Sequence, residues 1–511
     1  MNTRIIFRLK TLHGLLVLLI FTSFIIGVPQ TASAQTGSIN WDERINISQS
    51  PNMTSTDPFL LGDPAGLAHL FWAEKVFNVP GNVPDTVMYA AWDGQNWSQP
   101  IDVHFSPPSH GNQVVAFPHA VIDGNGIIHL IWLAQPNFPN YTLFYSWSHS
   151  NQAINQSGWS PPVAIAEDLT GTNYSIDIKV DSQQHLHIVY SRVPAGDSPP
   201  ELRATTYVSS TDSGETWSEP IDIYTVSVPS NGTSNTRLLI DDDDNIFASW
   251  SVWDRTGNGQ AIGFARSMDN GLTWEAPILI AERIGNEYER DWNNMAYLGD
   301  NTIVAFWEGG WRAYRHVMYS YDAGLTWTDP TDIFPGLIGE NGFVEFVRDG
   351  DGNLHLFYSQ RTREGNNLRS GFGLWHSVWE GGTRWREPTL SGGNYPMLNP
   401  KVAIINGNQI VSTWYTSPEF EIWVMTGTII GVTSVLPQLW EIVEMEPENT
   451  STPETNIVLS TPVHEQPVLI LETEPSSSHL GDNPGMVILL GIFPSFFIVS
   501  IVFLIVRQNR R

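Results

Sequence analysis

The sequence predicts an all-β protein whose main domain is a β-propeller built from four-stranded blades. Three observations predict this fold: a tryptophan phrase that recurs at a nearly constant spacing, a hairpin pattern between its copies, and incomplete patterns at the two ends that complete each other. Such self-similarity is typical of propellers. Seven blades are predicted, with six as the alternative, and the N-terminal strand is expected to close the ring.

The recurring phrase is Trp-x-x-Pro-x-x followed by Ile, Val or Leu. Copies begin at Trp97, Trp159, Trp217, Trp274 and Trp327, a weaker copy begins at Trp385, and another begins at Trp41, where Arg44 replaces the proline. Neighbouring copies lie 53 to 62 residues apart. A spacing of this size is typical of a repeated unit of four short strands.

A hairpin pattern lies between the copies of the phrase. In 117–132, 174–190 and 342–358, a short apolar run meets a polar turn, and a second run ends in Trp or Tyr. Turns rich in Asp, Gly and Asn between alternating apolar runs are hairpin signals. Inner hairpins are therefore expected to begin near seven positions: Asp57, Pro118, Tyr174, Thr236, Trp292, Phe343 and Pro400.

The two ends of the repeat complete each other. The last hairpin, from Pro400, is followed by one more apolar strand but by no tryptophan phrase, whereas the phrase at Trp41 has no hairpin before it. Joining them makes one blade and removes the exposed sheet edges that an open array would present. The propeller is predicted to span residues 35–433.

Both termini are predicted to lie outside this domain. Basic residues, an apolar run over 15–28 and a small-residue site at 32–34 indicate a signal peptide over 1–34, with an uncleaved N-terminal anchor as the alternative. An uncharged apolar run followed by arginines predicts a transmembrane helix over 485–507 and a cytoplasmic tail over 508–511. The segment 434–484, rich in Pro, Glu, Ser and Thr, is expected to be a stalk.

Composition limits the classes of function. The chain of 511 residues has a formal net charge of -28 and no cysteine. The acidic balance argues against nucleic acid as a partner, because binding phosphates requires a basic surface. Without cysteine there is no disulfide framework, cysteine zinc site or thiol catalysis. No cofactor and no metal is predicted.

A sharper motif, Ser-x-Asp-x-Gly-x-Thr-Trp, occurs three times. Its key residues are Ser210, Asp212, Gly214 and Trp217; Ser267, Asp269, Gly271 and Trp274; and Ser320, Asp322, Gly324 and Trp327. The motif resembles the Asp-box, or bacterial neuraminidase repeat, of the sialidase superfamily. The aspartates are expected to brace their turns, the glycines to adopt positive φ and the tryptophans to pack between sheets.

The resemblance implies a sugar-processing propeller. Sialidases hold the substrate carboxylate with three arginines and use a Tyr nucleophile activated by Glu, with an Asp as acid/base. The early Phe/Tyr-Arg-Ile-Pro phrase that carries the family's first arginine does not occur in this sequence. Typical sialidases also have six blades. Only the Asp-box positions are therefore carried over.

Candidate site residues come from the loops expected on the ligand face of the ring, where strands 4 and 1, and strands 2 and 3, are connected. Ten arginines fall on this face or its approach: Arg192, Arg237, Arg255, Arg283, Arg290, Arg312, Arg315, Arg361, Arg363 and Arg369. They are interpreted either as an anion-binding group or as partners of nearby acidic residues. Guanidinium groups suit bidentate recognition of carboxylates.

For hydrolysis, the candidates are chosen by loop position. They are Arg255, Arg290, Arg312 and Arg361 for the anion, Trp253 and Trp311 for the sugar, Tyr288 or Tyr358 as nucleophile, and Glu287 or Glu308 as its partner. Aromatic faces beside charged groups fit sugar recognition. Packing between blades is the alternative role for these aromatic residues.

Two further patterns have structural and functional interpretations. His69, His129, His187 and His355 occupy one repeated place in second strands. They are predicted to be packing residues, with metal binding as the alternative. The run Asp241–Asp244 is predicted to be a hairpin turn, with a calcium site as the alternative.

Two hypotheses of function follow. The first is a membrane-anchored glycoside hydrolase of exo-α-sialidase type at the outer cell surface, with its N-terminus outside. The second is a non-catalytic propeller that binds an extracellular glycan or protein.

Overall fold

The computed structural model describes residues 37–50, 53–76, 85–105, 115–137, 140–169, 175–192, 203–228, 231–254, 258–283, 290–309, 314–338, 344–364, 367–368, 373–393 and 397–440. The chain divides into two compact units, 1–439 and 440–511. The predicted signal peptide, most of the stalk, the predicted transmembrane helix and the tail lie outside the described residues. No helix among the described residues has the length and apolar character needed to cross a membrane.

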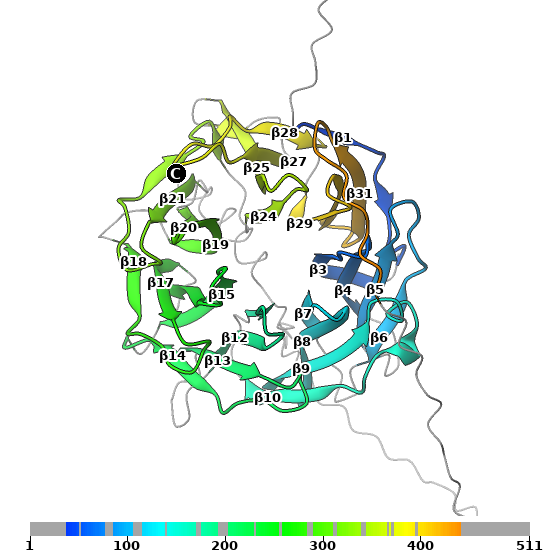
Figure 1. Cartoon of the computed structure of the whole chain (residues 1–511), viewed down its shortest axis with the longest axis horizontal. Coiled ribbons are helices and arrows are strands. Elements are labelled where there is room, and N and C mark those ends of the chain that lie inside the picture. The colour runs from blue at the N-terminus through cyan, green and yellow to red at the C-terminus, as the bar shows by residue number, and fades with distance from the viewer. Residues whose placement is uncertain are drawn as a thin grey trace, which may run out of the picture. The chain divides into compact units, whose positions relative to one another are not determined.

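The strands of the described residues form seven antiparallel sheets arranged as a ring, so the prediction of seven blades is confirmed (Figure 1). The first three blades, inner strand first, are β3 (Met53–Gly62), β4 (Ala68–Val76), β5 (Thr86–Trp92) and β6 (Ile101–Phe105); β7 (Val115–Ile122), β8 (Ile127–Asn137), β9 (Asn140–His149) and β10 (Val163–Leu169); and β11 (Ile176–Val180), β12 (Leu186–Arg192), β13 (Ala204–Ser210) and β14 (Ile221–Thr225). A short 3-10 helix, Gln156–Gly158, precedes β10.

The next two blades have the same order of four strands. They are β15 (Gly232–Ile240), β16 (Ile246–Trp253), β17 (Gly259–Ser267) and β18 (Ile278–Glu282), then β19 (Asp291–Gly299), β20 (Thr302–Gly309), β21 (Tyr314–Ser320) and β22 (Thr331–Ile333). The sixth blade is β24 (Glu345–Arg348), β25 (Leu354–Glu364), β27 (Gly373–Val378) and β28 (Thr389–Gly392). The short strands β23 (Leu337–Ile338) and β26 (Asn367–Leu368) also pair with β25.

The seventh blade joins the two ends of the propeller. Its strands β29 (Leu398–Ile405), β30 (Gln409–Tyr415) and β31 (Ile422–Ile429) are completed by β1 (Ile39–Trp41) and β2 (Ile45–Asn46), both of which pair with β31 (Figure 1). The predicted closure by the N-terminal strand is therefore confirmed. This pairing covers the edge that β31 would otherwise expose.

The tryptophan phrase marks the outer strand of every blade. In each blade the outer strand begins four residues after the tryptophan of the phrase, as with Ile101 after Trp97 and Ile221 after Trp217. The same offset places β2 four residues after Trp41. The recurring phrase is therefore one structural position repeated around the ring.

The core lies between neighbouring sheets. One aromatic residue at the same place in every second strand is almost completely buried: Trp72, Trp132, Tyr190, Trp250, Trp307, Tyr358 and Trp414. Burial of such large side chains contributes about 2–3 kcal/mol each. These residues stabilise the packing of blade against blade.

Five of the inner strands contain a bulge at the same level. The bulge residue of each has a positive φ: Asp57, Phe117, Asn235, Trp292 and Asn399. The pairing register with the second strand shifts at each of these points. A bulge re-aims the side chains that follow it, and here those side chains belong to the centre of the ring.

Candidate functional site

The three Asp-boxes brace turns on the outer part of the ring. In the first, the Asp212 carboxylate accepts hydrogen bonds from the Thr216 backbone N (2.8 Å) and hydroxyl (2.5 Å), and from the Ser210 hydroxyl (2.7 Å). These bonds, led by that of the Thr216 hydroxyl, lower the pKa of Asp212. The Ser210 hydroxyl in turn accepts the backbone N–H of Gly214 (2.8 Å).

The other two boxes repeat this geometry. The corresponding groups are Ser267, Asp269, Gly271 and Thr273, and Ser320, Asp322, Gly324 and Thr326. The box tryptophans pack edge-on against the preceding blade, with ring centroids 5.2 Å apart for Trp217 and Tyr145, 5.1 Å for Trp274 and Tyr207, and 5.1 Å for Trp327 and Phe264. All the groups of the box are thus used in holding turns and sheets.

The repeated histidines are buried in polar chains. His187 contacts the Tyr207 hydroxyl through Nδ1 (2.6 Å) and the Asp181 carboxylate through Nε2 (3.3 Å). His69 contacts Tyr89 and Asp63 in the same way, at 2.7 and 3.1 Å. The equivalent groups elsewhere are His129 with Asp123 and Tyr145, and His355 with Asp349 and His376. The histidines thus link hairpin turns to third strands.

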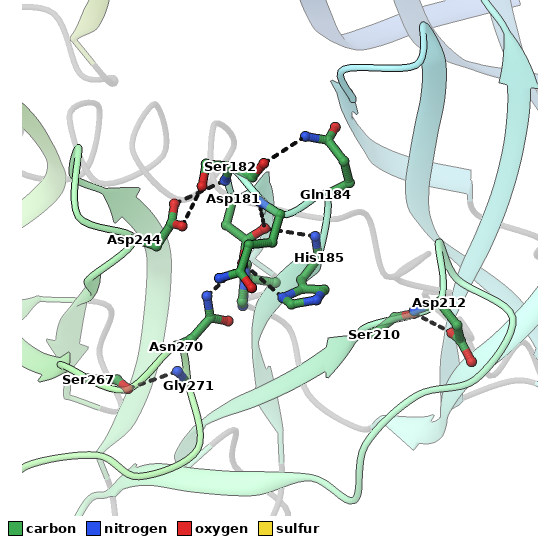
Figure 2. A network of polar contacts seen from close by, with 12 residues as sticks. Asp181, Ser182, Gln184, His185, Ser210, Asp212, Asp244, Ser267, Asn270 and Gly271 are labelled. Carbon is green, nitrogen blue, oxygen red and sulfur yellow. Dashed lines mark hydrogen bonds and ion pairs between the residues drawn. The ribbon is translucent and has the colours of Figure 1, made fainter.

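Figure 2 shows how the Asp181 turn connects to the next blade. The Asp181 carboxylate accepts a hydrogen bond from Asn270 Nδ2 (2.7 Å), and Ser182 donates its backbone N–H (2.9 Å) and hydroxyl (2.6 Å) to Asp244. The Asp241 carboxylate accepts backbone N–H groups of its own turn. The run 241–244 is therefore a braced hairpin turn. In the described part of the chain, no group of three or more His, Asp or Glu side chains is arranged to hold a metal.

Several candidates from the predicted ligand face lie outside the described residues: Arg255, Glu287, Tyr288, Trp311 and Arg312. Arg361 lies on β25, paired with Ile338 of β23. Arg290 directly precedes β19, and its backbone N–H bonds to the Gly259 carbonyl (3.1 Å). Trp253 ends β16 and is buried.

The structure brings Glu308 and Tyr358 to the boundary of the fifth and sixth blades, near Arg315. Glu308 and Arg315 form an ion pair (3.4 Å), and Arg315 Nε donates to Gln360 Oε1 (3.2 Å). Tyr358 is one of the seven repeated core aromatics, 1% exposed, and stacks on Phe334 with centroids 5.8 Å apart. Burial raises the pKa of Tyr358 well above its usual value, which opposes formation of a phenolate.

A buried carboxyl group that the sequence interpretation did not single out lies beside this cluster. Asp291 pairs across β19 and β20 with Glu308. Its Oδ1 accepts hydrogen bonds from Asn235 Nδ2 and from the Trp292 backbone N, both 2.7 Å. Burial raises the pKa of Asp291 to about 8. Burial thus favours the protonated form of the Asp291 carboxyl.

A further regular arrangement of side chains lies at the centre of the ring. One residue of each inner strand pairs with the residue that directly precedes the buried aromatic of the second strand. We call these seven residues the central ring: Phe59, His119, Asp177, Arg237, Asn294, Glu345 and Lys401. All seven line one cavity of about 570 Å³.

Neighbouring members of the central ring interact. Phe59 stacks on His119 with centroids 4.7 Å apart, and His119 Nδ1 lies 3.5 Å from Asp177 Oδ1. Lys401 donates a hydrogen bond to Glu345, and they form an ion pair. Burial lowers the pKa of His119 to about 4, so its imidazole is neutral at pH 7.

Further charged side chains line the cavity wall between the central ring and the inner hairpin turns. Lys179, two residues further along β11, lies 3.2 Å from Asp177. Burial opposes ionisation of Asp177, but Lys179 and the hydrogen bond from His119 outweigh it and lower its pKa. Asp242 and Arg348 also line the cavity, at the level of the inner hairpin turns.

Comparison with known proteins adds solved structures of low similarity. The sequence matches no protein-family model and no curated protein. Structural matches include a protein of unknown function from Dyadobacter fermentans (13% identity, 77% of this chain and 99% of that chain, TM-score 0.47) and the NanB sialidase of Streptococcus pneumoniae (14%, 77% and 71%, TM-score 0.44). A polysaccharide lyase, an ulvan lyase, also matches (12%, 75% and 95%, TM-score 0.47). Similarity of this degree assigns neither a family nor an activity to the chain.

Proposed function

We propose that this protein is a cell-surface propeller that binds an acidic carbohydrate. The signal peptide, stalk and transmembrane helix predicted from the sequence fit display outside the cell, with the propeller (35–433) held away from the membrane. A propeller without enzymatic activity that binds a glycan is favoured over one that cleaves it.

The observation that supports binding of an anion is the central cavity. The chain has only four lysines, and two of them, Lys179 and Lys401, line this cavity together with Arg237 and Arg348. An acidic protein of net charge -28 repels anions in general. The cations gathered in this cavity offset the repulsion locally. The cavity walls are partly charged and partly apolar, which suits a small polar ligand.

The predicted catalytic residues give less support to hydrolysis. Tyr358 is buried in the core with a raised pKa, and Glu308 is paired with Arg315. A nucleophile must be exposed to substrate and close to its activating base. Tyr288 and Glu287 are the remaining candidates for these roles.

Hydrolysis of the exo-α-sialidase type is the second candidate function. It is favoured by one specific arrangement, namely that Glu308, Arg315 and Gln360 form a connected group beside Tyr358 and Asp291. Such a group, beneath the predicted ligand face, would hold catalytic side chains of the loops in position.

The experiment that tests these proposals uses the full chain in detergent on an array of acidic and neutral glycans, together with fluorogenic sialosides. Binding to acidic glycans without release of the fluorophore is expected. Turnover of a sialoside would establish the second candidate instead. Absence of both would contradict the proposal of a carbohydrate ligand, and capture of a protein ligand from the cell surface would then support a protein partner.

A further inference from the structure

We propose that the central cavity holds the anionic group of the ligand, a sugar carboxylate or sulfate, and that the ligand enters from the face formed by the inner hairpin turns. This inference rests on the proposed function and adds the anionic group that the cavity holds and the face from which the ligand enters. The sequence interpretation expected ligands on the opposite, loop-bearing face.

The first argument is the construction of the site. All seven inner strands contribute one side chain at one register position, and all seven side chains line the cavity. Five of these strands bulge just before this position. The central ring is therefore a set of side chains held by the backbone of the whole propeller, and such rigid support favours binding.

The second argument is charge. Around the cavity centre, Arg237, Lys401 and Lys179 oppose Asp177 and Glu345, and His119 is neutral at pH 7. Among the described side chains of this group, three are cationic and two are anionic. Arg237 is 8% exposed and Lys401 is 7% exposed, and water screens charges at such sites less than at the surface. A ligand with a single negative charge would balance the site.

The third argument is the direction in which the cavity extends. Its lining runs from the central ring toward Ile240, Asp242, Gly299 and Arg348, at the ends of inner strands or in their hairpin turns. Among described residues, none that precedes the central ring on an inner strand lines it. Asp242 and Arg348 are exposed and form the rim on this side.

The fourth argument is size and surface. Small-ligand sites enclose roughly 300–1,000 Å³, and about 570 Å³ is available here. Phe59, Met295 and Phe346 add apolar surface beside the charged groups. This mixture fits the C–H faces, hydroxyls and single anionic group of an acidic sugar at a chain end.

In the test, the full chain in detergent is titrated separately with D-glucuronate, glucose 6-sulfate and D-glucose. Binding is measured by ligand-observed NMR. Binding of one or both anions, with no binding of glucose, is expected. The variant Lys179→Gln removes a cation whose side chain is 39% exposed, so the fold is expected to remain. Affinity for the anion should fall about tenfold. Arg384→Gln removes the same charge from an exposed site that does not line the cavity, and should change little.

A second pair of variants tests for a change in anion affinity in the opposite direction. Asp242→Asn removes an anion from the rim and should tighten anion binding by about threefold. Asp243→Asn makes the same change in the same turn at an exposed residue that does not line the cavity, and its effect should be smaller. Partial unfolding does not tighten binding, so this pair separates electrostatics from instability.

The outcomes of the two tests are distinct. Two results would show that the site lies elsewhere. In the first, acidic glycans bind on the array but neither D-glucuronate nor glucose 6-sulfate binds. In the second, Lys179→Gln and Asp242→Asn leave anion binding unchanged. Either result overturns this inference and leaves the proposed function standing. If no acidic glycan binds at all, the proposed function fails.

Discussion

The side chain of Asn270, in the Asp-box of the fourth blade, donates a hydrogen bond of 2.7 Å to the carboxylate of Asp181 in the inner hairpin turn of the third blade. One residue of an outer turn thus supports the polar chain through His187 to Tyr207 in the neighbouring blade. The Asp-boxes therefore connect blades as well as bracing their own turns.

We expect Asn270→Ala to lower the free energy of unfolding by about 1–2 kcal/mol, since the buried Asp181 carboxylate loses one hydrogen-bond donor. The backbone should tolerate the change, because the equivalent residue of the next box is Ala323, with φ 53° against 60° for Asn270. Chemical denaturation measures the effect. Ser213→Ala, at the same position of the first box, is the control and should be nearly neutral.

Gly214→Ala is expected to destabilise the protein by more than about 2 kcal/mol. Gly214 has φ +89°, and a Cβ there would overlap the Tyr145 ring. Gly381→Ala is the matched control, because Gly381 has φ +96° and open space around the Cβ position. Equal loss of stability in the two variants would show that backbone conformation alone requires glycine.

The hydroxyls of two buried tyrosines should differ in importance. Tyr207→Phe removes the hydroxyl that contacts His187 and should cost about 1–2 kcal/mol of stability. The Tyr358 hydroxyl has no hydrogen-bond partner among the described residues, so Tyr358→Phe should change stability by less than about 0.5 kcal/mol. Thermal unfolding compares them. Loss of glycosidase activity in Tyr358→Phe, with stability unchanged, would support Tyr358 as a nucleophile.

Acid should weaken the hairpin turns. Burial alone would raise the pKa of Asp181, but hydrogen bonds from His187, Asn270 and the His185 backbone lower it overall. A carboxyl whose folded pKa lies below its unfolded value of about 3.9 stabilises the fold above that value and loses this contribution as the pH falls. The stability of Asp181→Asn should therefore depend less on pH between 5 and 2 than that of the wild type.

Asp291 should show the opposite dependence. Its pKa of about 8 in the fold lies above the unfolded value, so its contribution is complete at low pH and is lost as the pH rises toward 8. The free energy of unfolding of Asp291→Asn, relative to wild type, should rise between pH 5 and pH 9. A constant difference across this range would mean that Asp291 is ionised in the fold.

The repeat was predictable because one phrase marks one position. The offset from each tryptophan to its outer strand is the same in all seven blades, so the phrase predicted blade number and closure directly. Figure 2 likewise shows local turn contacts around Ser210 and Asp212 that the Asp-box motif predicts. Polar contacts within a few residues leave a pattern that a single sequence displays.

The central ring left no such pattern. Its members differ in residue type, and their alignment depends on bulges whose left-handed residues, such as Phe117 and Trp292, also share no residue type. The sequence predicts Arg237 on the ligand face or its approach, whereas it lies on the wall of the central cavity. Asp291 belongs to a run of charged and aromatic residues in the sequence, but its raised pKa results from tertiary burial, which no neighbouring residue indicates.

The pairing of β1 with β31 also affects how the propeller folds and closes. Thr426 donates a hydrogen bond of 2.8 Å to Asp42, 384 residues away in the chain. Contacts of such separation form late and slow folding. Translation of the last blade must be complete before the first strand can pair with β31. Closure of the ring during folding therefore depends on the pairing of two short N-terminal strands, β1 and β2, with β31.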